Sequence, residues 1–398
     1  MQMSIPIFFL FTIYSIINVY LPLFLRNMGY TATLVGFLLA CFEISGLVFP
    51  LILSPIIAKK GKYSLFLIIF AVAMIIIPFP LYSIPGLGVT AICLSLYAIG
   101  FKGAVPVSDS LVNSILGDKR NNYGKVRVAG SIGFVSMNLL LQVVIHVDTI
   151  TVNEKIFWTA LPSALFLLSI IFVPGLLHFK PALDSSTSEE ISLDTKVKKE
   201  SIFTTLKKFS PTYWFGIIAL FLIFLGLTPS TRFFSMYVDE YLHSDASALL
   251  WALAALSEIP FMFFSYRFIR KYNTISLLIF CAIFATIRNL FYICVPNLFG
   301  AALGQLCNSI TYGLLHPVAV IFATEHAPDK KSLVVSMSMY SVLAVGVANF
   351  VGNVIGGFLI DTFGYPFFFV SFAILPLIPV IAYFFLKKKL NKQSKSTL

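Results

Sequence analysis

The sequence is poor in charged residues. Asp, Glu, Lys and Arg make up only 11% of its 398 residues, whereas 58% are hydrophobic. A water-soluble protein of this length needs more polar surface, so we expect most of the chain to face lipid. The sequence also lacks the alternating strands, about 10 residues long, of a membrane barrel. Its apolar runs are about 20 residues long, which predicts membrane-spanning helices.

Motifs typical of enzymes are absent as well. There is no G-x-S-x-G, no H-E-x-x-H and no Walker-type phosphate loop, which argues against a membrane-embedded enzyme and against ATP-driven transport. The cysteines all lie in apolar runs without C-x-x-C spacing, so they predict neither a metal nor a redox site. They are Cys41, Cys93, Cys281, Cys294 and Cys307. We therefore expect no catalytic residue, no cofactor and no metal.

The apolar runs predict twelve spans. They cover roughly residues 5–25, 33–57, 64–84, 89–116, 127–147, 155–178, 211–236, 246–270, 274–294, 298–324, 332–360 and 365–386. Lys and Arg gather in the loops on one side of these spans, and the other side holds only Arg26 and Lys155 with several acids. Basic loops stay in the cytoplasm, so both termini are expected there.

This asymmetry also explains the net charge of +11. It reflects topology and contact with anionic lipid headgroups, and we expect no nucleic-acid partner. The short loops favour a bacterial protein of the inner membrane that crosses the bilayer many times. No large exposed interface is evident, which makes a monomer the expectation.

Two proline hinges repeat 211 residues apart. Pro106 and Pro317 each lie in an apolar span, and each precedes a charged turn by twelve residues. The turns are Asp118-Lys119-Arg120 and Asp329-Lys330-Lys331. An offset near half the chain predicts two similar bundles, as in transporters that alternate access between the two sides of the membrane. We expect bundles at 1–179 and 211–387, a cytoplasmic linker at 180–210 and a tail at 388–398, with both prolines as gating residues.

The loop after the second span carries a family resemblance. Ser54-Pro55-Ile56-Ile57-Ala58-Lys59-Lys60-Gly61-Lys62 resembles the Gly-x-x-x-Asp-Arg-x-Gly-Arg motif of the major facilitator superfamily. The first Gly is replaced by Ser54 and the Asp by Ala58. The resemblance implies an all-α membrane protein whose twelve helices form two pseudo-symmetric halves around a central cavity. It also implies that Lys59, Lys60, Gly61 and Lys62 act in gating.

A second stretch, Tyr123–Phe134, resembles the branch that includes the lactose permease and the phenylpropionate-permease-like transporters. Asp109 lies eighteen residues before Arg127, the spacing of an acid and an arginine that together grip the sugar in that permease. The resemblance therefore implies that Asp109 and Arg127 bind substrate. A structural ion pair between two helices is the alternative.

Charges inside a bilayer are unfavourable and need a partner, a polar cavity or a function. Lys102 shares a helical face with Asp109, and Arg288 lies in the ninth span, so we add both bases to the substrate-binding candidates. Asn308 and Tyr312 lie four residues apart in the tenth span and extend this set. Arginine and carboxylate groups suit paired bonds to hydroxyls or to a carboxylate.

Glu258 is the preferred candidate for proton coupling. It lies mid-span and resembles the acid on the same helix of the lactose permease that serves both sugar and proton. A carboxyl group in an apolar environment can exchange a proton near physiological pH. Glu43 and His316 are the alternative candidates, and a static partner for a nearby arginine is the alternative role for Glu258. The permease's Lys-x-x-His-x-x-Glu cluster has no match here.

Together these features predict a proton-coupled symporter for a small polar or anionic solute. The bases within the spans outnumber the acids by one, which favours an anion such as an aromatic carboxylate. A neutral sugar or nucleoside is the close alternative. A proton-driven exporter of drugs or metabolites on the same fold is the other hypothesis. The partners that we expect are the solute, the proton and the lipid bilayer.

Overall fold

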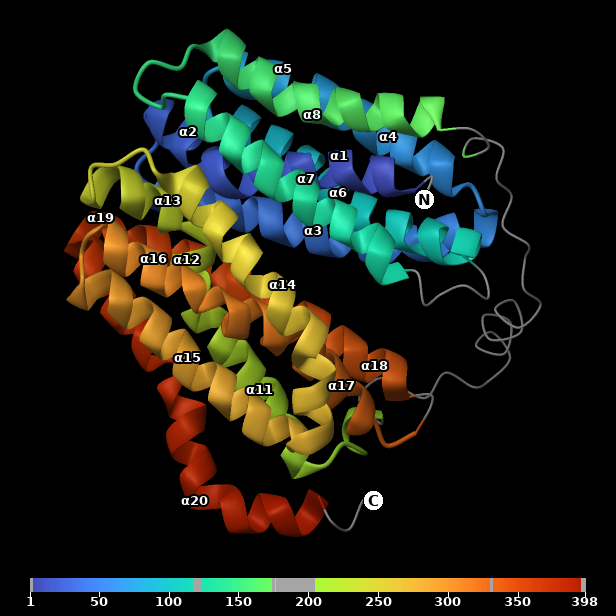
Figure 1. Cartoon of the computed structure of the whole chain (residues 1–398), viewed down its shortest axis with the longest axis vertical. Helices are drawn as coiled ribbons and strands as arrows, with labels where there is room; N and C mark the ends of the chain where they lie inside the picture. Colours follow the sequence, from blue (N-terminus) through green and yellow to red (C-terminus); the bar gives the residue numbers. More distant parts are fainter. Residues whose placement is uncertain (1–2, 117–122, 174–175, 177–204, 330–331, 395–398) are drawn as a thin grey trace. The chain divides into compact units, whose positions relative to one another are not determined.

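The computed structural model describes residues 3–116, 123–173, 176, 205–329 and 332–394. Their secondary structure is helical and includes no strand (Figure 1). The first part of the chain forms α1 (Ser4–Ser15), the π-helix η1 (Ile16–Tyr20), α2 (Leu21–Asn27), α3 (Ala32–Lys60), α4 (Tyr63–Ile76), α5 (Pro78–Ser83), α6 (Leu87–Leu116), α7 (Tyr123–Val144) and α8 (Val152–Phe172).

The second part begins after residue 204 and contains three more π-helical segments. It forms α11 (Pro211–Gly226), α12 (Thr228–Arg232), α13 (Phe234–Met236), η3 (Tyr237–Tyr241), α14 (Ser247–Lys271), α15 (Thr274–Cys294), α16 (Leu298–Leu306), η4 (Ser309–Leu314), α17 (Leu315–Glu325), α18 (Ser332–Ser338), η5 (Met339–Val347), α19 (Ala348–Ile374) and α20 (Leu377–Ser394).

Nine helical stretches in the described ranges are long and apolar enough to cross a membrane. One of them, Ser332–Leu386, is divided by Gly364, whose φ of 77° interrupts the helix. A bent pair, Ser247–Phe261 with Phe264–Lys271, is one further candidate span, and Pro211–Gly226 is a shorter apolar helix. The predicted all-α membrane protein is confirmed, and a count of twelve spans is consistent with these helices.

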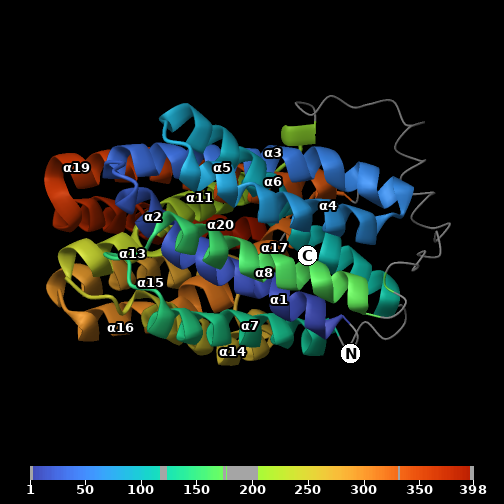
Figure 2. The same cartoon turned by 90° about the horizontal axis from the view of Figure 1, so that it is seen from above.

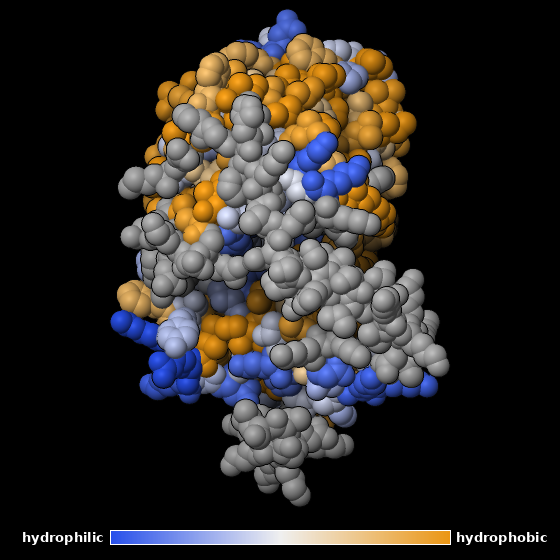
Figure 3. Space-filling model, turned by 90° about the vertical axis from the view of Figure 1, so that its right-hand side faces the viewer, coloured by the Kyte–Doolittle hydropathy of each residue, from blue (hydrophilic) through white to orange (hydrophobic). Residues whose placement is uncertain are grey.

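The surface of the spans is apolar, as a bilayer requires. Val143 and Phe172, for example, are 73% and 76% exposed. On the face shown in Figure 3, hydrophobic residues cover large areas and many hydrophilic residues gather along the lower margin. A folded chain in water would bury such side chains, so this surface is suited to contact with lipid.

Contacts divide the chain into two compact units, which we call unit 1 and unit 2. Unit 1 contains residues 1–17, 41–137 and 148–201. In it, α4 packs against α6 and α8, and α1 packs against α8, an arrangement that can be followed in Figure 2. Ser15 of α1 also donates to the carbonyl of Phe134 in α7 over 2.8 Å. These contacts hold α1, α6 and α7 in place for the polar residues described below.

Unit 2 contains residues 18–40, 138–147 and 202–398, so it joins short segments of the first half of the chain to the second half. The Asp361 carboxylate of α19 accepts hydrogen bonds from the backbone N–H groups of Ala32 (3.0 Å) and Thr33 (2.7 Å). It thereby caps the N-terminus of α3. Nearby, the Glu240 carboxylate accepts bonds from Arg26 and from the Tyr365 hydroxyl.

The predicted division into bundles at 1–179 and 211–387 stays a prediction. Most of the predicted linker, residues 180–204, lies outside the described residues, as do the turns at Asp118-Lys119-Arg120 and Lys330-Lys331. The two prolines of the repeat have different settings. Pro106 lies inside α6, whereas Pro317 lies in the first turn of α17, directly after η4. Each proline removes a backbone donor and loosens the helix around it.

Candidate solute and proton sites

In unit 1, α6 carries two charged residues that pair with two different helices. Lys102 Nζ lies 3.3 Å from Glu43 Oε2 of α3. Seven residues further along α6, Asp109 Oδ1 lies 3.3 Å from Arg127 Nη1 of α7. The spacing of eighteen residues predicted a partnership of Asp109 with Arg127, and the two side chains do meet.

The Asp109–Arg127 pair is only partly buried. The two side chains are 28% and 33% exposed, although both lie in apolar spans. The Arg127 guanidinium also lies over the Phe11 ring of α1, with its carbon 4.5 Å from the ring centroid. Gly130 permits this approach, since a Cβ there would come within 2.7 Å of the same ring. The pair therefore offers a carboxylate, a guanidinium and an aromatic face at one place.

The Glu43–Lys102 pair has a different environment. The Glu43 side chain is 6% exposed, against 28% for Lys102. Close packing of α3 on α6 produces this burial, because Gly46 leaves space that the Lys102 stem fills, with a hypothetical Cβ only 2.4 Å from Cγ. This acid is thus held against a base inside unit 1.

In unit 2, Arg288 is the centre of a buried polar network. It lies on α15, which begins where the Asn273 side chain accepts a bond from the backbone N–H of Ile275. Arg288 is 1% exposed. Its N–H groups donate to four uncharged side chains: Tyr292 Oη (3.2 Å), Asn308 Oδ1 (2.6 Å), Thr311 Oγ1 (3.0 Å) and Gln305 Oε1 (2.7 Å). The network therefore ties α15 to α16 and η4.

Glu258 adjoins this network through one amide. Asn308 Nδ2 donates to Glu258 Oε1 of α14, so the carboxylate is linked to Arg288 by the two ends of a single side chain. Gly313 of η4 brings the backbones together here, because a Cβ on it would lie 3.2 Å from the Glu258 carbonyl oxygen. The Glu258 side chain is half-buried at this contact.

The other candidates of the tenth span do not share the position of Asn308. Asn308 is buried at 5% exposure, whereas Tyr312 is 46% exposed. The spacing of four residues would place both on one face of a regular α-helix, but η4 replaces the regular turns here and changes the angular spacing. His316 bonds through Nδ1 to the Tyr340 hydroxyl (2.9 Å) and packs against Tyr312 with ring centroids 4.3 Å apart.

Of the basic segment predicted to act in gating, Lys59 and Lys60 are the last residues of α3, and only Gly61 and Lys62 lie between α3 and α4. Lys60 and Lys62 are exposed, and the side chain of Lys59 is outside the described set. Gly61 has a φ of 63°, a left-handed conformation that glycine adopts without strain and that allows the tight turn. Its role in gating stays a prediction, as does that of Pro106 and Pro317.

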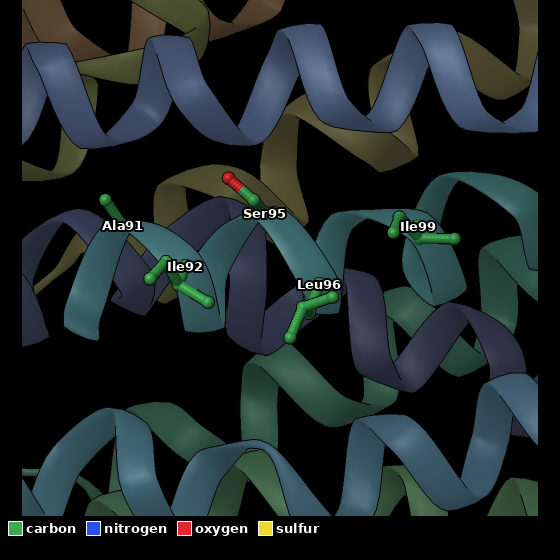
Figure 4. Close-up of a pocket in the computed structure, with 5 residues that line it drawn as sticks. All are labelled: Ala91, Ile92, Ser95, Leu96 and Ile99. Carbon is green, nitrogen blue, oxygen red and sulfur yellow. The ribbon is translucent and has the colours of Figure 1, made fainter. Parts of the chain in front are cut away.

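Among the described residues, neither a metal-binding cluster nor the groove on α6 offers a site for a polar solute. In the described part of the chain, no group of three or more His, Cys, Asp or Glu side chains is arranged to hold a metal ion. A shallow groove on α6 is lined by Ala91, Ile92, Ser95, Leu96 and Ile99 (Figure 4). Ile92 and Leu96 are 62% and 50% exposed, so this groove is suited to contact with lipid.

Some site residues could not be found from the sequence. Phe11 looks like any other aromatic residue of an apolar span, and only its contact with Arg127 distinguishes it. Thr311 and Gln305 become recognisable only as acceptors for Arg288. A buried arginine demands acceptors, but which side chains supply them depends on how three helical segments pack.

Charged side chains of both signs inside apolar, bent spans define the class of this molecule: a membrane transporter of the major facilitator type. The chain belongs to the MFS_1 like family, whose model matches residues 1–371.

The comparisons agree on this class. Maltose permease of Geobacillus stearothermophilus is 22% identical over 369 residues, which cover 92% of this chain and 82% of that protein. The putative nucleoside transporter YegT of Escherichia coli strain K12 is 22% identical over 361 residues, covering 85% and 79%. The solved structure of the nucleoside transporter NupG aligns with a TM-score of 0.79 at 14% identity, covering 97% of this chain and 98% of that one. These proteins are transporters, not enzymes, and the structural likeness shows a shared fold.

Proposed function

We propose that this protein is a proton-coupled symporter for a neutral, polyhydroxylated solute, a sugar or a nucleoside, and that it works by alternating access. The observation that carries the proposal is the Asp109–Arg127 pair, partly exposed beside Phe11. A carboxylate accepts bonds from hydroxyl groups, and a guanidinium donates two parallel bonds. The aromatic ring adds a flat apolar surface for a sugar ring or a base.

The pairing of the bases supports a neutral solute over an anion. Lys102 and Arg127 each contact an acid, and Arg288 donates to four uncharged groups. An anion gains most from a base that is accessible and not already paired with an acid, and Arg288, whose acceptors are neutral, is only 1% exposed. The excess of one base, from which the sequence favoured an aromatic carboxylate, therefore counts for less. The names of the maltose permease and of the nucleoside transporters point the same way for those proteins.

We assign the proton to Glu258 in preference to Glu43. Glu43 lies at ion-pair distance from Lys102, and neutralising it would remove the negative charge opposite that base. Glu258 bonds instead to a neutral amide, a setting in which both the charged and the protonated form can be accommodated. His316 is bonded to Tyr340 and is the third candidate.

The proposal includes a location and an orientation. The excess of Lys and Arg on one side of the spans supports cytoplasmic N- and C-termini in a bacterial inner membrane. The protein would function there as a monomer. Tyr312, which is 46% exposed, would line the solute path in unit 2. Asn308 would hold Arg288 and Glu258, and Lys102 would hold Glu43.

The test is proton movement in lipid vesicles that contain the purified full chain. A panel of maltose, uridine and phenylpropionate is added outside, and external pH is recorded with an impermeant dye. We expect maltose or uridine, but not phenylpropionate, to make the outside more alkaline. Arg127→Ala and Glu258→Gln should each abolish the signal.

Arg267→Ala is the matched control. Arg267 also stacks on an aromatic ring, Phe264, at 4.9 Å, but it is an exposed residue near the end of α14. Its replacement should leave the signal unchanged. A signal with phenylpropionate alone would overturn the neutral-solute assignment, and acidification outside on adding solute would indicate the proton-driven exporter instead.

A further inference from the structure

Two buried asparagine side chains make no hydrogen bond among the described residues. Asn138 of α7 and Asn353 of α19 are both 0% exposed, and the oxygen and the nitrogen of each amide are without a partner. The other buried amides of the described chain, Asn289, Gln305 and Asn308, each make at least one bond. A desolvated and unpaired amide is unfavourable, and buried polar groups are nearly always bonded. These two asparagines therefore destabilise the arrangement in which they are found.

The internal repeat of the chain relates the two asparagines to each other. Asn353 follows Asn138 by 215 residues. The same offset separates Ala32 from Ser247, where α3 and α14 begin. The pair of α7 with α14 is therefore equivalent to the pair of α19 with α3. The same rare feature, a buried amide without a partner, thus occurs at equivalent positions in the two halves of the chain.

Asn138 lies one helical turn from a contact that α7 makes with the beginning of α14. Gln142 follows Asn138 by four residues, and its side chain donates to the Asp245 carbonyl (3.0 Å) and accepts from the Leu249 N–H (2.9 Å). In the proposed orientation the beginning of α14 is at the outer side of the membrane. This contact therefore closes α7 on α14 between Asn138 and the outer surface.

Asn353 has the equivalent place beneath a contact of α19 with the beginning of α3. Gly357 follows Asn353 by four residues and packs on α3, since a Cβ on it would lie 2.2 Å from the Ala32 carbonyl oxygen. One turn deeper, a Cβ on Gly36 would lie 2.2 Å from the Asn353 carbonyl oxygen. The two backbones thus touch at the level of the unpaired amide and seal it from the outer side.

We propose that Asn138 and Asn353 are a symmetry-related pair of solute-binding residues, which act when the outer contacts of α7 with α14 and of α19 with α3 are open. An amide offers two N–H donors and an acceptor oxygen, which match the hydroxyl groups of a sugar or a nucleoside. A solute that bonds to the amides only in the open arrangement shifts the protein towards it. The proposal rests on the proposed function and deepens it, because it assigns two uncharged binding residues for a neutral solute.

The unpaired amides also explain how the closed arrangement is kept from becoming too stable. Closing removes the solute and water from the two side chains and leaves them without partners, as they are found here. This raises the free energy of the closed arrangement relative to the open one. A smaller part of the solute's binding free energy is then needed to open the outer contacts.

Replacement by leucine, which has a similar branched shape, distinguishes this role from packing. Asn138→Leu and Asn353→Leu each remove two unpaired polar atoms from the interior, so the thermal midpoint of the purified full chain should rise by a few degrees. Asn289→Leu is the matched control. Asn289 is also 0% exposed, but it donates to the Gly226 carbonyl over 2.7 Å, so its replacement should lower the midpoint. An equal fall in all three variants would overturn the proposal.

Solute affinity should fall in the same two leucine variants, and only from the outer side. With radiolabelled maltose or uridine outside right-side-out vesicles, the concentration at half-maximal uptake should rise about tenfold, because solute hydroxyl groups lose their partners. In inverted vesicles the solute arrives from the cytoplasmic side, where the outer contacts are closed and the amides are sealed. There the half-maximal concentration should stay nearly unchanged. An equal rise on both sides, or no rise on either, would contradict the assignment.

The Asn353→Cys variant tests exposure of this position by labelling. It is made in a chain whose five native cysteines are replaced by alanine, and a membrane-impermeant maleimide is added outside. We expect labelling, and we expect saturating maltose or uridine to slow it. Asn289→Cys in the same background should not be labelled. Absence of labelling at position 353, or a rate that no transported solute changes, would overturn the proposal.

These experiments fail separately from the proposed function. If maltose or uridine is taken up without proton movement, and uptake depends on Asn138 and Asn353 as expected, the proton coupling is wrong and the binding pair stands. If only phenylpropionate is transported and slows the labelling, the solute class is wrong and the pair stands. If maltose or uridine moves protons but neither leucine variant changes the half-maximal concentration, the pair is wrong and the proposed function stands.

Discussion

Two arginines inside the spans, Arg127 of unit 1 and Arg288 of unit 2, have opposite environments. Arg127 of unit 1 contacts an acid directly, is a third exposed and lies over an aromatic ring. Arg288 of unit 2 is almost completely buried, donates to four neutral groups, and approaches an acid only through an amide. A partly exposed ion pair can exchange partners with a solute, whereas a buried and saturated arginine cannot do so without disrupting its surroundings. We therefore expect the same residue type to serve solute binding in unit 1 and internal structure in unit 2.

The largest difference should appear on removing Arg288. In Arg288→Leu, four buried acceptors lose their donor, and each such group costs about 1–3 kcal/mol. The sum is comparable to the total stability of an ordinary domain. We expect little monodisperse protein in detergent, or a thermal midpoint lowered by about 10 °C or more. Size-exclusion chromatography and a thermal-shift assay measure this, and an unchanged midpoint would contradict the structural role of the network.

Removing Arg127 should instead affect activity and spare stability. A partly exposed ion pair contributes about 1 kcal/mol or less to folding, whereas a charge-assisted bond to solute is worth about 1.5–3 kcal/mol. Arg127→Ala should therefore lower maltose or uridine uptake about 10- to 100-fold and leave the thermal midpoint nearly unchanged. The double exchange Asp109→Arg/Arg127→Asp is the control. Recovery of transport in it would mean that the pair is only structural.

Replacing Glu258 should affect proton movement, whereas replacing Glu43 should affect folding. Glu258→Gln should abolish solute-driven proton movement but retain counterflow, because exchange needs no proton release. Glu43→Gln leaves Lys102 without its acid and should mainly reduce the yield of folded protein. Proton flux and counterflow, compared in the same vesicle preparations, separate these effects. Proton movement that survives Glu258→Gln and disappears in Glu43→Gln would reverse the assignment.

The smallest effect is expected at Asp361, which is neither a solute-binding nor a proton-coupling candidate. Asp361→Asn keeps one acceptor for the first N–H groups of α3 but loses the negative charge at the helix N-terminus. Helix caps and charges of this kind contribute about 1 kcal/mol. The thermal midpoint should fall by a few degrees, and the solute concentration at half-maximal uptake should not change. Asp148→Asn, at an exposed acid, is the control, and a tenfold change in that concentration would show that Asp361 acts on the solute site.

Much of the fold followed from local hydropathy. Long apolar runs must become helices in lipid, so the spans were predictable from composition alone. The Gly364 kink between the last two spans and the Pro106 position inside α6 also agree with the predicted boundaries. The meeting of Asp109 with Arg127 was predictable as well, because their spacing matched a known pair on adjacent helices.

Hydropathy and residue spacing were enough to predict membrane-spanning helices, charges inside them, and the meeting of Asp109 with Arg127 in unit 1. The partners of each charge, in contrast, depend on how the helices pack. The regular spacing of Asn308 and Tyr312 predicted a shared face, yet η4 leaves one buried and the other exposed. Arg288 acquires its acceptors from residues 4 to 23 positions away on α15, α16 and η4. Hydropathy acts locally along the chain, but the environment of a buried charge is a property of several packed helices at once.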